Sequence, residues 1–301
     1  MVDNVFDFTS NESLTENNSS DEINLPNEFS LSDFDPISHT DYRIFDFEER
    51  IDADNNFFNQ FQVNCQHYTD DKFKDIKLPN KGLSIIHFNV RSLSANFSSL
   101  SDYLNTLGFH FDIIALSETW LNMNSNSNLY SLPGYDFCHV DRCDKRGGGV
   151  AFYIKNSLKY NLVGEMCTTI DDVIECITIE LFLSNKKRVI ISCLYRPPGS
   201  PFDIFNETIE KLFFNKKQDL FLCGDFNTNL LDYTSHSVIN FVNNLFGLGI
   251  FPLIDKPTRI TRLTASLIDN IFTNVLNKNI TSGIFITDVS DHFPVFYYFR
   301  V

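Results

Sequence analysis

Two short polar motifs lie next to strongly apolar segments of the chain. Gly224-Asp225-Phe226-Asn227 follows the apolar run Leu220–Cys223, and Ser290-Asp291-His292 precedes the apolar run Phe293–Phe299. Carboxylates, a carboxamide and an imidazole at strand ends are the groups that metal-assisted cleavage of a phosphodiester requires. They supply hard oxygen ligands, a base for water and donors for the phosphate. The two motifs therefore indicate an enzyme that cuts phosphate esters.

Other polar residues share this placement at the end of an apolar segment, or just inside one. A single glutamate after a strand is usually a solvated loop residue, and a single asparagine in a turn usually serves backbone geometry. A set of seven, with an Asp–Asn pair and an Asp–His pair, is hard to attribute to loop composition. The seven are Asn89, Glu118, Tyr195, Asp225, Asn227, Asp269 and His292.

The segments that position these residues begin at residue 83. Strands are expected at 83–90, 112–116, 135–140, 149–154, 173–182, 189–194, 220–223, 267–272, 280–286 and 294–299. Helical spacing of apolar residues predicts helices over 95–107, 201–214 and 235–246. Many strands with few helices, some strands wholly apolar and others alternating, predict two packed β-sheets with helices outside them. The predicted class is α/β.

The negative charge of the chain is concentrated at its N-terminal end. The whole chain has a formal charge of −15. Residues 1–80 hold 18 acidic and 5 basic residues, a net charge of −13, so residues 81–301 are close to neutral. Residues 1–80 also lack a sustained period of 2 or 3.6, and this composition predicts a disordered or loosely helical segment. A linker or tail is favoured over an acidic-aromatic interaction segment. The folded domain is expected to span residues 81–301.

Cysteine usage and the lack of targeting signals indicate an intracellular setting. The seven cysteines form no CxxC pair and no zinc-like spacing. Unpaired thiols are typical of reducing compartments. The start of the chain shows no basic and apolar signal region, and no apolar run approaches the ~20 residues of a membrane span. We expect a nuclear or cytoplasmic protein.

The order of the polar residues resembles that of a known superfamily. Asn89, Ser117-Glu118-Thr119, Gly224-Asp225-Phe226-Asn227, Asp269 and Ser290-Asp291-His292 follow the order seen in the endonuclease/exonuclease/phosphatase superfamily. That superfamily includes DNase I, apurinic/apyrimidinic endonucleases and inositol polyphosphate phosphatases. Further motifs resemble the endonuclease domain of LINE-type, jockey/CR1-like non-LTR retrotransposons. These motifs are Phe88-Asn89-Val90-Arg91-Ser92-Leu93, Ser117-Glu118-Thr119-Trp120-Leu121, Gly147-Gly148-Gly149-Val150, Tyr195-Arg196-Pro197-Pro198 and Pro257-Thr258-Arg259.

The resemblance implies a fold, an activity and a set of residue roles. The fold is a DNase I-like, four-layered α-β-β-α sandwich. The activity is that of a Mg2+-dependent DNA endonuclease, with Mn2+ as a substitute ion, which nicks one strand and leaves a 3′-hydroxyl. The implied metal residues are Glu118, Asn89 and Asp291. The implied catalytic residues are Asp225 at the attacking water, Asn227 and Tyr195 at the phosphate, and His292 oriented by Asp269. The expected substrate contacts are Arg196, Thr258, Arg259 and Arg146.

Some of these residues also have purely structural interpretations. For Tyr195 the alternative is a buried ring that caps a strand, and for Thr258 it is a turn hydroxyl. Asp291 has the alternative of orienting its own loop. His87, inside the first strand, is expected to be a satisfied core histidine rather than a ligand.

The charge of the folded domain does not by itself indicate DNA binding. Basic residues nevertheless lie in predicted loops, and a cluster of them around the carboxylates would supply local phosphate contacts. Arg196-Pro197-Pro198 stands where abasic-site enzymes carry a polar, Asn-containing loop, which disfavours abasic specificity. The basic loop residues are Arg91, Arg142, Lys145, Arg146, Arg196, Arg259 and Arg262.

Two other functions stay open. A phosphatase of the same superfamily would need a lysine-rich pocket near His292, which the sequence does not show. A catalytically silent relic would have lost catalytic side chains, and none of the seven polar positions is lost. A complete LINE reading frame continues into a reverse transcriptase, so a chain that ends at Val301 is expected to be a fragment or a domesticated copy.

The acidic segment generates a prediction about DNA binding. Its net charge of −13 would compete with DNA for the arginine-bearing loops. Deleting residues 1–80 is expected to raise the affinity for DNA, most strongly at low salt, as measured by fluorescence anisotropy of a labelled duplex. An unchanged affinity at low salt would rule out this competition.

Overall fold

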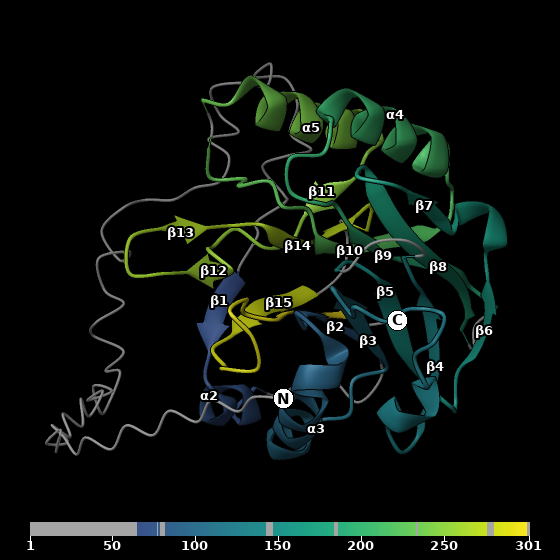
Figure 1. The fold of residues 1–301 in the computed structure, drawn as a ribbon, viewed down its shortest axis with the longest axis vertical. Coiled ribbons are helices and arrows are strands. Elements are labelled where there is room, and N and C mark those ends of the chain that lie inside the picture. The colour runs from purple at the N-terminus through teal and green to yellow at the C-terminus, as the bar shows by residue number, and fades with distance from the viewer. Residues whose placement is uncertain are drawn as a thin grey trace, which may run out of the picture. The chain divides into compact units, whose positions relative to one another are not determined.

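Two β-sheets packed face to face form the centre of the domain (Figure 1). The computed structural model describes residues 65–76, 78, 82–142, 147–183, 186–232, 234–275 and 280–299. Within these residues, sheet A contains, in spatial order, β1 (Cys65–Tyr68), β15 (Ile280–Phe285), β16 (Val295–Phe299), β2 (Leu83–Asn89), β3 (Ile113–Ser117), β5 (Val150–Lys155) and β4 (Tyr135–Val140).

Sheet B has the same number of strands in the described part of the chain. Its order is β11 (Phe251–Pro252), β14 (Asp269–Thr273), β10 (Asp219–Asp225), β9 (Arg188–Tyr195), β8 (Ile174–Phe182) and β6 (Lys159–Leu162), with β7 (Thr168–Ile170) paired to β8. A separate hairpin joins β12 (Arg259–Ile260) to β13 (Ala265–Ser266). Both sheets are mixed, because β2 runs parallel to β3 and β9 parallel to β10 while their other neighbours are antiparallel.

Helices cover the outer faces of the two sheets (Figure 1). Short α2 (Asp70–Lys74) and long α3 (Leu93–Leu107) lie against sheet A, and α4 (Phe202–Phe213) and α5 (His236–Gly247) lie against sheet B. Single turns of 3-10 helix occur at η3 (Ser127–Tyr130) and η4 (Gly164–Met166). The predicted four-layered α-β-β-α sandwich is confirmed. Among the described residues, no helix has both the length and the apolar character that crossing a membrane demands.

The apolar residues of strand β2 are buried on both faces of the sheet. Successive side chains of a strand point to opposite faces. Leu83 and Ile85 lie in the core between the sheets, while Ile86 and Phe88 pack in the second core beneath α3. The strand is therefore buried on both faces, and the polar residues at its end are held by a rigid element.

The folded domain begins earlier than residue 81. The four residues of β1 pair in parallel with β15, and α2 packs its single buried side chain, Phe73, against Phe285 and Phe296. The boundary predicted after residue 80 is therefore placed too late, because residues 65–74 are part of sheet A and its covering layer. Residues 1–64 lie outside the described residues. They hold the whole net charge of −13 assigned to residues 1–80, so a deletion that tests charge competition should end at residue 64.

Gly224 allows the backbones of β9 and β10 to approach closely, one residue before β10 ends at Asp225. It pairs with Leu194 in the parallel register. A Cβ atom at this position would collide with the carbonyl oxygen of Leu194. Since the obstacle is backbone, no side-chain movement can relieve the collision. The glycine of the Gly-Asp-Phe-Asn motif is therefore required by the packing of the strands that place Asp225.

Gly224→Ala is expected to lower the free energy of unfolding by about 3 kcal/mol, because a methyl group is forced into a closed backbone contact. Urea denaturation measures the change. Gly247→Ala is the matched control, since no atom lies within 4 Å of a Cβ built at that helical position. We expect the control to be neutral or slightly stabilising. A Gly224→Ala protein as stable as wild type would contradict the close-approach argument.

Candidate functional site

The predicted polar residues meet where strands of both sheets end. Asn89 and Ser117 are paired at the ends of the parallel strands β2 and β3. Tyr195 and Asp225 are paired in the same way at the ends of β9 and β10, and Asp225 also pairs with Asp269 of β14. The register of the two sheets therefore brings residues from distant parts of the sequence to one end of the sandwich.

Asp225 lies at the centre of this site and is fully buried. Its Oδ1 accepts the backbone N–H of Asn227 at 2.8 Å, and its Oδ2 accepts the side-chain amide of Asn227 at 3.1 Å. Burial, and then the charge of Asp269, raise the pKa of Asp225 to about 8. The carboxyl group therefore holds a proton near neutral pH when no cation is bound beside it.

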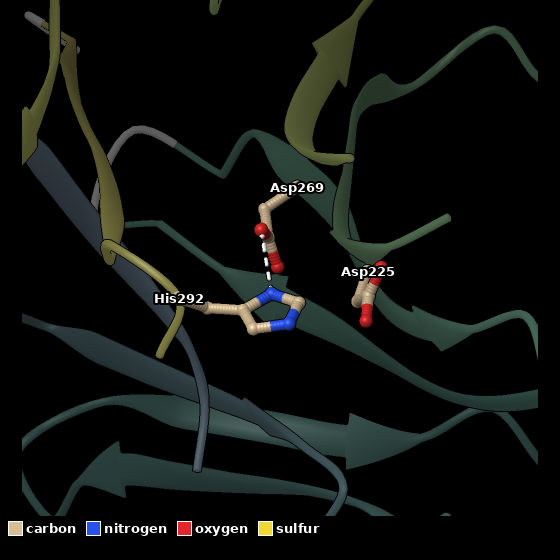
Figure 2. A group of neighbouring side chains, drawn as sticks. All are labelled: Asp225, Asp269 and His292. Atoms are coloured by element: carbon tan, nitrogen blue, oxygen red, sulfur yellow. Dashed lines mark hydrogen bonds and ion pairs between the residues drawn. The ribbon is translucent and has the colours of Figure 1, made fainter. Parts of the chain in front are cut away.

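His292 and Asp269 form a second buried pair. His292 Nδ1 lies 2.9 Å from Asp269 Oδ2, and the imidazole ring lies between the carboxylates of Asp269 and Asp225 (Figure 2). Burial alone would lower the pKa of His292, but the carboxylates of Asp269 and Asp225 raise it to about 9. The imidazole is therefore a cation at neutral pH, hydrogen-bonded to Asp269 through Nδ1.

Glu118 is the acidic residue of the site supplied by sheet A. Its Oε1 accepts a hydrogen bond from Asn89 Nδ2 at 2.9 Å, and its Oε2 accepts one from Trp120 Nε1 at 3.1 Å. The same Asn89 nitrogen donates to Asp225 Oδ2 at 2.8 Å. Asn89 Oδ1 accepts the backbone N–H of Arg91 at 3.1 Å. Asn89 therefore joins the two carboxylates by donation, and its predicted role as a metal ligand stays a prediction.

The loops that carry these groups hold an unusual backbone conformation. Non-glycine residues with positive φ are uncommon, and they persist where the surrounding structure imposes them, often at functional sites. Five of those found in the described residues lie in the loops of this site. They are Arg91 (φ 43°), Ser92 (φ 90°), Glu118 (φ 53°), Trp120 (φ 56°) and Asn227 (φ 43°).

Asp291 lies at the rim of the site in an ion-pair cluster. Its Oδ2 is 2.8 Å from Arg91 Nη1 and 2.7 Å from Arg259 Nη2. Burial works to raise the pKa of Asp291, and hydrogen bonds from Arg259 and Arg91, together with the charge of His292, bring it below the usual value. The carboxylate thus pairs with two guanidinium groups, and its predicted role as a metal ligand stays a prediction. Arg259 lies at the rim, as expected for a substrate contact, but it is engaged with Asp291.

Two predicted substrate contacts face the protein interior instead. Arg196 is 2% exposed, and its guanidinium stacks 3.9 Å above the ring of Phe202 and donates to the carbonyl oxygen of Asn227 at 3.2 Å. Thr258 is fully buried and donates from Oγ1 to Asp269 Oδ2 at 2.8 Å. Arg196 thus holds the Asn227 loop and Thr258 orients Asp269, and their contact with substrate stays a prediction. Arg146 lies outside the described residues.

The ring of Tyr195 is buried, as expected for a residue that caps a strand, but the charged groups around it belong to the site. Burial, then the charges of Glu118 and Asp225, raise the pKa of its phenol. The hydroxyl is therefore protonated and available as a donor. His87 fits its prediction as a core histidine: it is fully buried, lies 3.0 Å from Ser117 Oγ through Nε2, and burial lowers its pKa to about 4.

An ion pair beneath the site was missed from the sequence. Glu175 of β8 and Arg142 are both buried, and Arg142 Nε donates to Glu175 Oε1 at 2.6 Å. Glu175 Oε2 accepts the backbone N–H of Gly149. A Cβ at Gly148 would collide with Glu175, and one at Gly149 would collide with the Thr119 hydroxyl. The pair thus holds the glycine loop against the Thr119-Trp120 turn. In the sequence, an acidic residue inside the apolar strand Ile174-Glu175-Cys176-Ile177 could have indicated this buried ion pair.

Comparison with known proteins identifies this arrangement. Residues 86–292 match the model of the endonuclease/exonuclease/phosphatase family. The chain belongs to this family. The match runs from β2 to His292 and so contains every residue of the site that the sequence pointed to, together with the missed Glu175 and Arg142. No curated protein sequence matches the chain.

Solved structures of the endonuclease/exonuclease/phosphatase family share the fold at low sequence identity. The endonuclease domain of TRAS1, a telomere-specific non-LTR retrotransposon, is 15% identical, covering 73% of this chain and 98% of that chain with a TM-score of 0.55. AP endonuclease LMAP from Leishmania major is 15% identical, covering 83% and 96% with a TM-score of 0.60. The 3′ phosphatase NExo from Neisseria, bound to a product DNA hairpin, is 18% identical, covering 73% and 100% with a TM-score of 0.54.

The chemistry of the site is that of a hydrolase with a candidate metal centre. Ligand atoms of Asp225, Asp269 and His292 all lie within 4.8 Å of one another. Glu118 adds a fourth acidic or imidazole group, tied to Asp225 through Asn89. The family and the side chains agree on hydrolysis of a phosphate ester, and they leave the choice between endonuclease and phosphatase to further argument.

Asp225→Asn is expected to make the metal-free protein more stable at pH 8 than wild type. The pKa of Asp225 is raised from 3.8 to about 8 in the folded state, so between these values the unfolded chain releases a proton that the folded protein retains. The carboxyl group therefore lowers the free energy of unfolding progressively as pH rises from 4 to 8. Urea denaturation in a chelator measures both proteins. A difference that does not shrink toward pH 4 would contradict the assignment.

Proposed function

We propose that this protein is a Mg2+-dependent DNA endonuclease that nicks one strand and leaves a 3′-hydroxyl and a 5′-phosphate. The observation that carries the proposal is the pairing of two carboxylates from different sheets, Glu118 and Asp225, by the single amide group of Asn89. Opposite them stands the imidazolium of His292, held by Asp269. Acid oxygens on one side and a fixed cation on the other suit the pentacovalent phosphate of phosphodiester hydrolysis.

The donor set fits Mg2+ better than a softer cation. Mg2+ binds through one or two carboxylates and substrate phosphate oxygens, and Glu118 and Asp225 each place an oxygen within 3 Å of the same Asn89 nitrogen. His292 uses Nδ1 for Asp269, so an imidazole-based site for a softer metal is less well supported. Glu118 would hold the ion, with Mn2+ as a substitute, and when bound the ion would neutralise charge on the phosphate.

Asp225 would orient and deprotonate the attacking water. Its raised pKa means that the carboxyl group holds a proton in the metal-free protein, and a cation held by Glu118 would favour the carboxylate, which can accept a proton from water. The two amide donors from Asn227 fix the direction of its oxygens. The water oxygen bonds to phosphorus as its proton passes to the Asp225 carboxylate, and the bond from phosphorus to the 3′ oxygen breaks.

The remaining groups would stabilise the charge that this step creates. His292, cationic and anchored through Nδ1, would donate from Nε2 to a phosphoryl oxygen. The Tyr195 phenol, kept protonated among the carboxylates, would donate to the phosphate or to the departing 3′ oxygen. Asn227 lies close enough to contact the phosphate, although its amide group now serves Asp225 and the Arg196 carbonyl oxygen.

DNA is the substrate that the rim of the site favours. Arg91 and Arg259 flank Asp291 beside His292 and would be available to neighbouring phosphates along a strand. The hairpin that starts at Arg259 ends in the exposed residues Arg262 and Leu263, the latter 94% exposed. A projecting hairpin with a basic base and an apolar tip suits a nucleic-acid groove better than a small phosphorylated molecule.

Within the family, the motifs favour the LINE-type retrotransposon branch. Phe88-Asn89-Val90-Arg91-Ser92-Leu93 and Ser117-Glu118-Thr119-Trp120-Leu121 resemble that branch, and the TRAS1 endonuclease domain is among the structures that share the fold. A nuclear or cytoplasmic location is part of this proposal. A phosphatase of the same family and a silent relic are the rival functions.

Nicking of supercoiled plasmid DNA tests the proposal. We expect relaxation with Mg2+, none in a chelator, and a loss of about 100-fold or more in Asp225→Ala and His292→Ala, because each removes a group that acts on the reacting atoms. Asp203→Ala and His236→Ala are the matched controls, since both side chains are exposed on helices that cover sheet B. Both controls should nick like wild type.

The single tryptophan of the chain separates the rival functions. Because Trp120 Nε1 donates to Glu118, cation binding at Glu118 should change its fluorescence. Folded wild-type protein that responds to Mg2+ but does not nick DNA would support a phosphatase, to be assayed on small phosphate esters. Protein that neither responds nor nicks would support a silent relic, and nicking that persists in Asp225→Ala would refute the assigned role.

A further inference from the structure

Residues 253–258, called here the crossing segment, run from sheet B to sheet A and end at the active site. At its start, Leu253 donates its N–H to Ile271 of β14, and its carbonyl oxygen accepts from Ser282 of β15 at 2.8 Å. At its end, Thr258 donates to Asp269 Oδ2 and accepts the backbone N–H of Phe293 at 2.7 Å. The position of Thr258 therefore governs both Asp269 and the loop that carries His292.

Strand β1 holds the middle of the crossing segment. His67 Nε2 lies 3.1 Å from the carbonyl oxygen of Pro257, and the His67 ring meets the ring of Phe293 edge to face at 6.5 Å. Cys65, two residues earlier on the same face, is buried beside Asp255, whose pKa burial raises to about 6. Alternate residues of this short strand thus face alternate residues of the crossing segment.

The register of sheet A explains why His67 is available there. His67 pairs with Ile284, Ile284 with Val295, and Val295 with His87. Neighbouring residues in such a row share a face, and Ile284 and Val295 belong to the core between the sheets. His67 therefore points toward sheet B at the open side of the sandwich, where the crossing segment passes.

This contact lies outside the residues that match the family model. The family match begins at residue 86, whereas β1 spans residues 65–68. The strand also belongs to the part of the chain whose composition gave no sign of regular structure. A side chain outside the matched domain is thus bonded to the residue that precedes Thr258.

We propose that His67 is a positioning residue, which fixes Pro257 and Thr258 and through them the Asp269–His292 pair. The donor is the neutral imidazole, which gives its Nε2 hydrogen to the Pro257 carbonyl oxygen. Burial lowers the pKa of His67, so this form is the one present at neutral pH. The catalytic consequence rests on the proposed function, because it assumes that Asp269 and His292 act on a phosphate.

The alternative is that β1 and the His67 ring only fill space at the sheet edge. Two substitutions separate these roles. His67→Phe keeps a ring against Phe293 but has no donor for Pro257, whereas His67→Gln keeps a donor and loses the ring. Gln66→Ala is the matched control, because Gln66 is the exposed neighbour on the same strand.

Amide hydrogen exchange of the full-length protein is the first measurement. The amides of Ile268, Asp269 and Phe293 all donate to atoms of Thr258. In His67→Phe we expect these amides to exchange about tenfold faster, with the amides of β9 and β10 unchanged. His67→Gln and Gln66→Ala should exchange like wild type. Wild-type rates in His67→Phe, or fast exchange in His67→Gln, would overturn the proposal.

Plasmid nicking is the second measurement. We expect His67→Phe to lower kcat roughly 10-fold to 100-fold, because Asp269 and His292 lose the position that Thr258 gives them. His67→Gln should restore kcat. Faster exchange without a loss of kcat would overturn the positioning role. If wild-type protein does not nick DNA, the proposed function fails, and the exchange rates still decide whether His67 fixes Thr258.

Discussion

One carboxamide holds the candidate active site together, because Asn89 donates the same side-chain nitrogen to Glu118 in sheet A and to Asp225 in sheet B. Two carboxylates this close repel each other, and a shared donor offsets part of that repulsion. The reach of one amide group also limits how far the ends of the two sheets can separate. The core between the sheets, packed from both faces, sets that separation. The packing of the two sheets thus sets the distance at which Asn89 can reach both carboxylates.

Holding the charged groups of this site in the interior lowers the stability of the folded protein. Asp225, Asp269 and His292 are all buried, and burial penalises each charged form. The imidazolium of His292 between two acids offsets some of this penalty, and the positive φ angles of Glu118 and Asn227 add backbone strain. The packing of the surrounding strands offsets the destabilising effect of the site.

Much of the fold could be predicted, because alternation and apolar runs report directly on strands buried on one face or both. The placement of Glu118 and Asp225 at strand ends followed from the apolar runs that precede them, at 113–116 and 220–223. The direction of a side chain after its strand could not be predicted: Arg196 turns inward over Phe202, and Asp291 pairs with arginines distant in sequence. Strand β1 was missed for a related reason, because four residues with no clear pattern become a strand only by pairing with β15, more than two hundred positions away.

The glycine loop beneath Glu118 and the hairpin tip differ in how much their sequences can change. Gly148 and Gly149 both have positive φ, and each would drive a Cβ into a neighbouring side chain, Glu175 or Thr119. A side chain at either position would disturb Glu175 or the Thr119-Trp120 turn beside Glu118, so this part of the site tolerates little change in sequence. The hairpin tip around Leu263 has no such restriction, because its side chain lies almost wholly in solvent. Substitutions at the hairpin tip can therefore change the exposed rim of the site while the glycine loop beside Glu118 is kept.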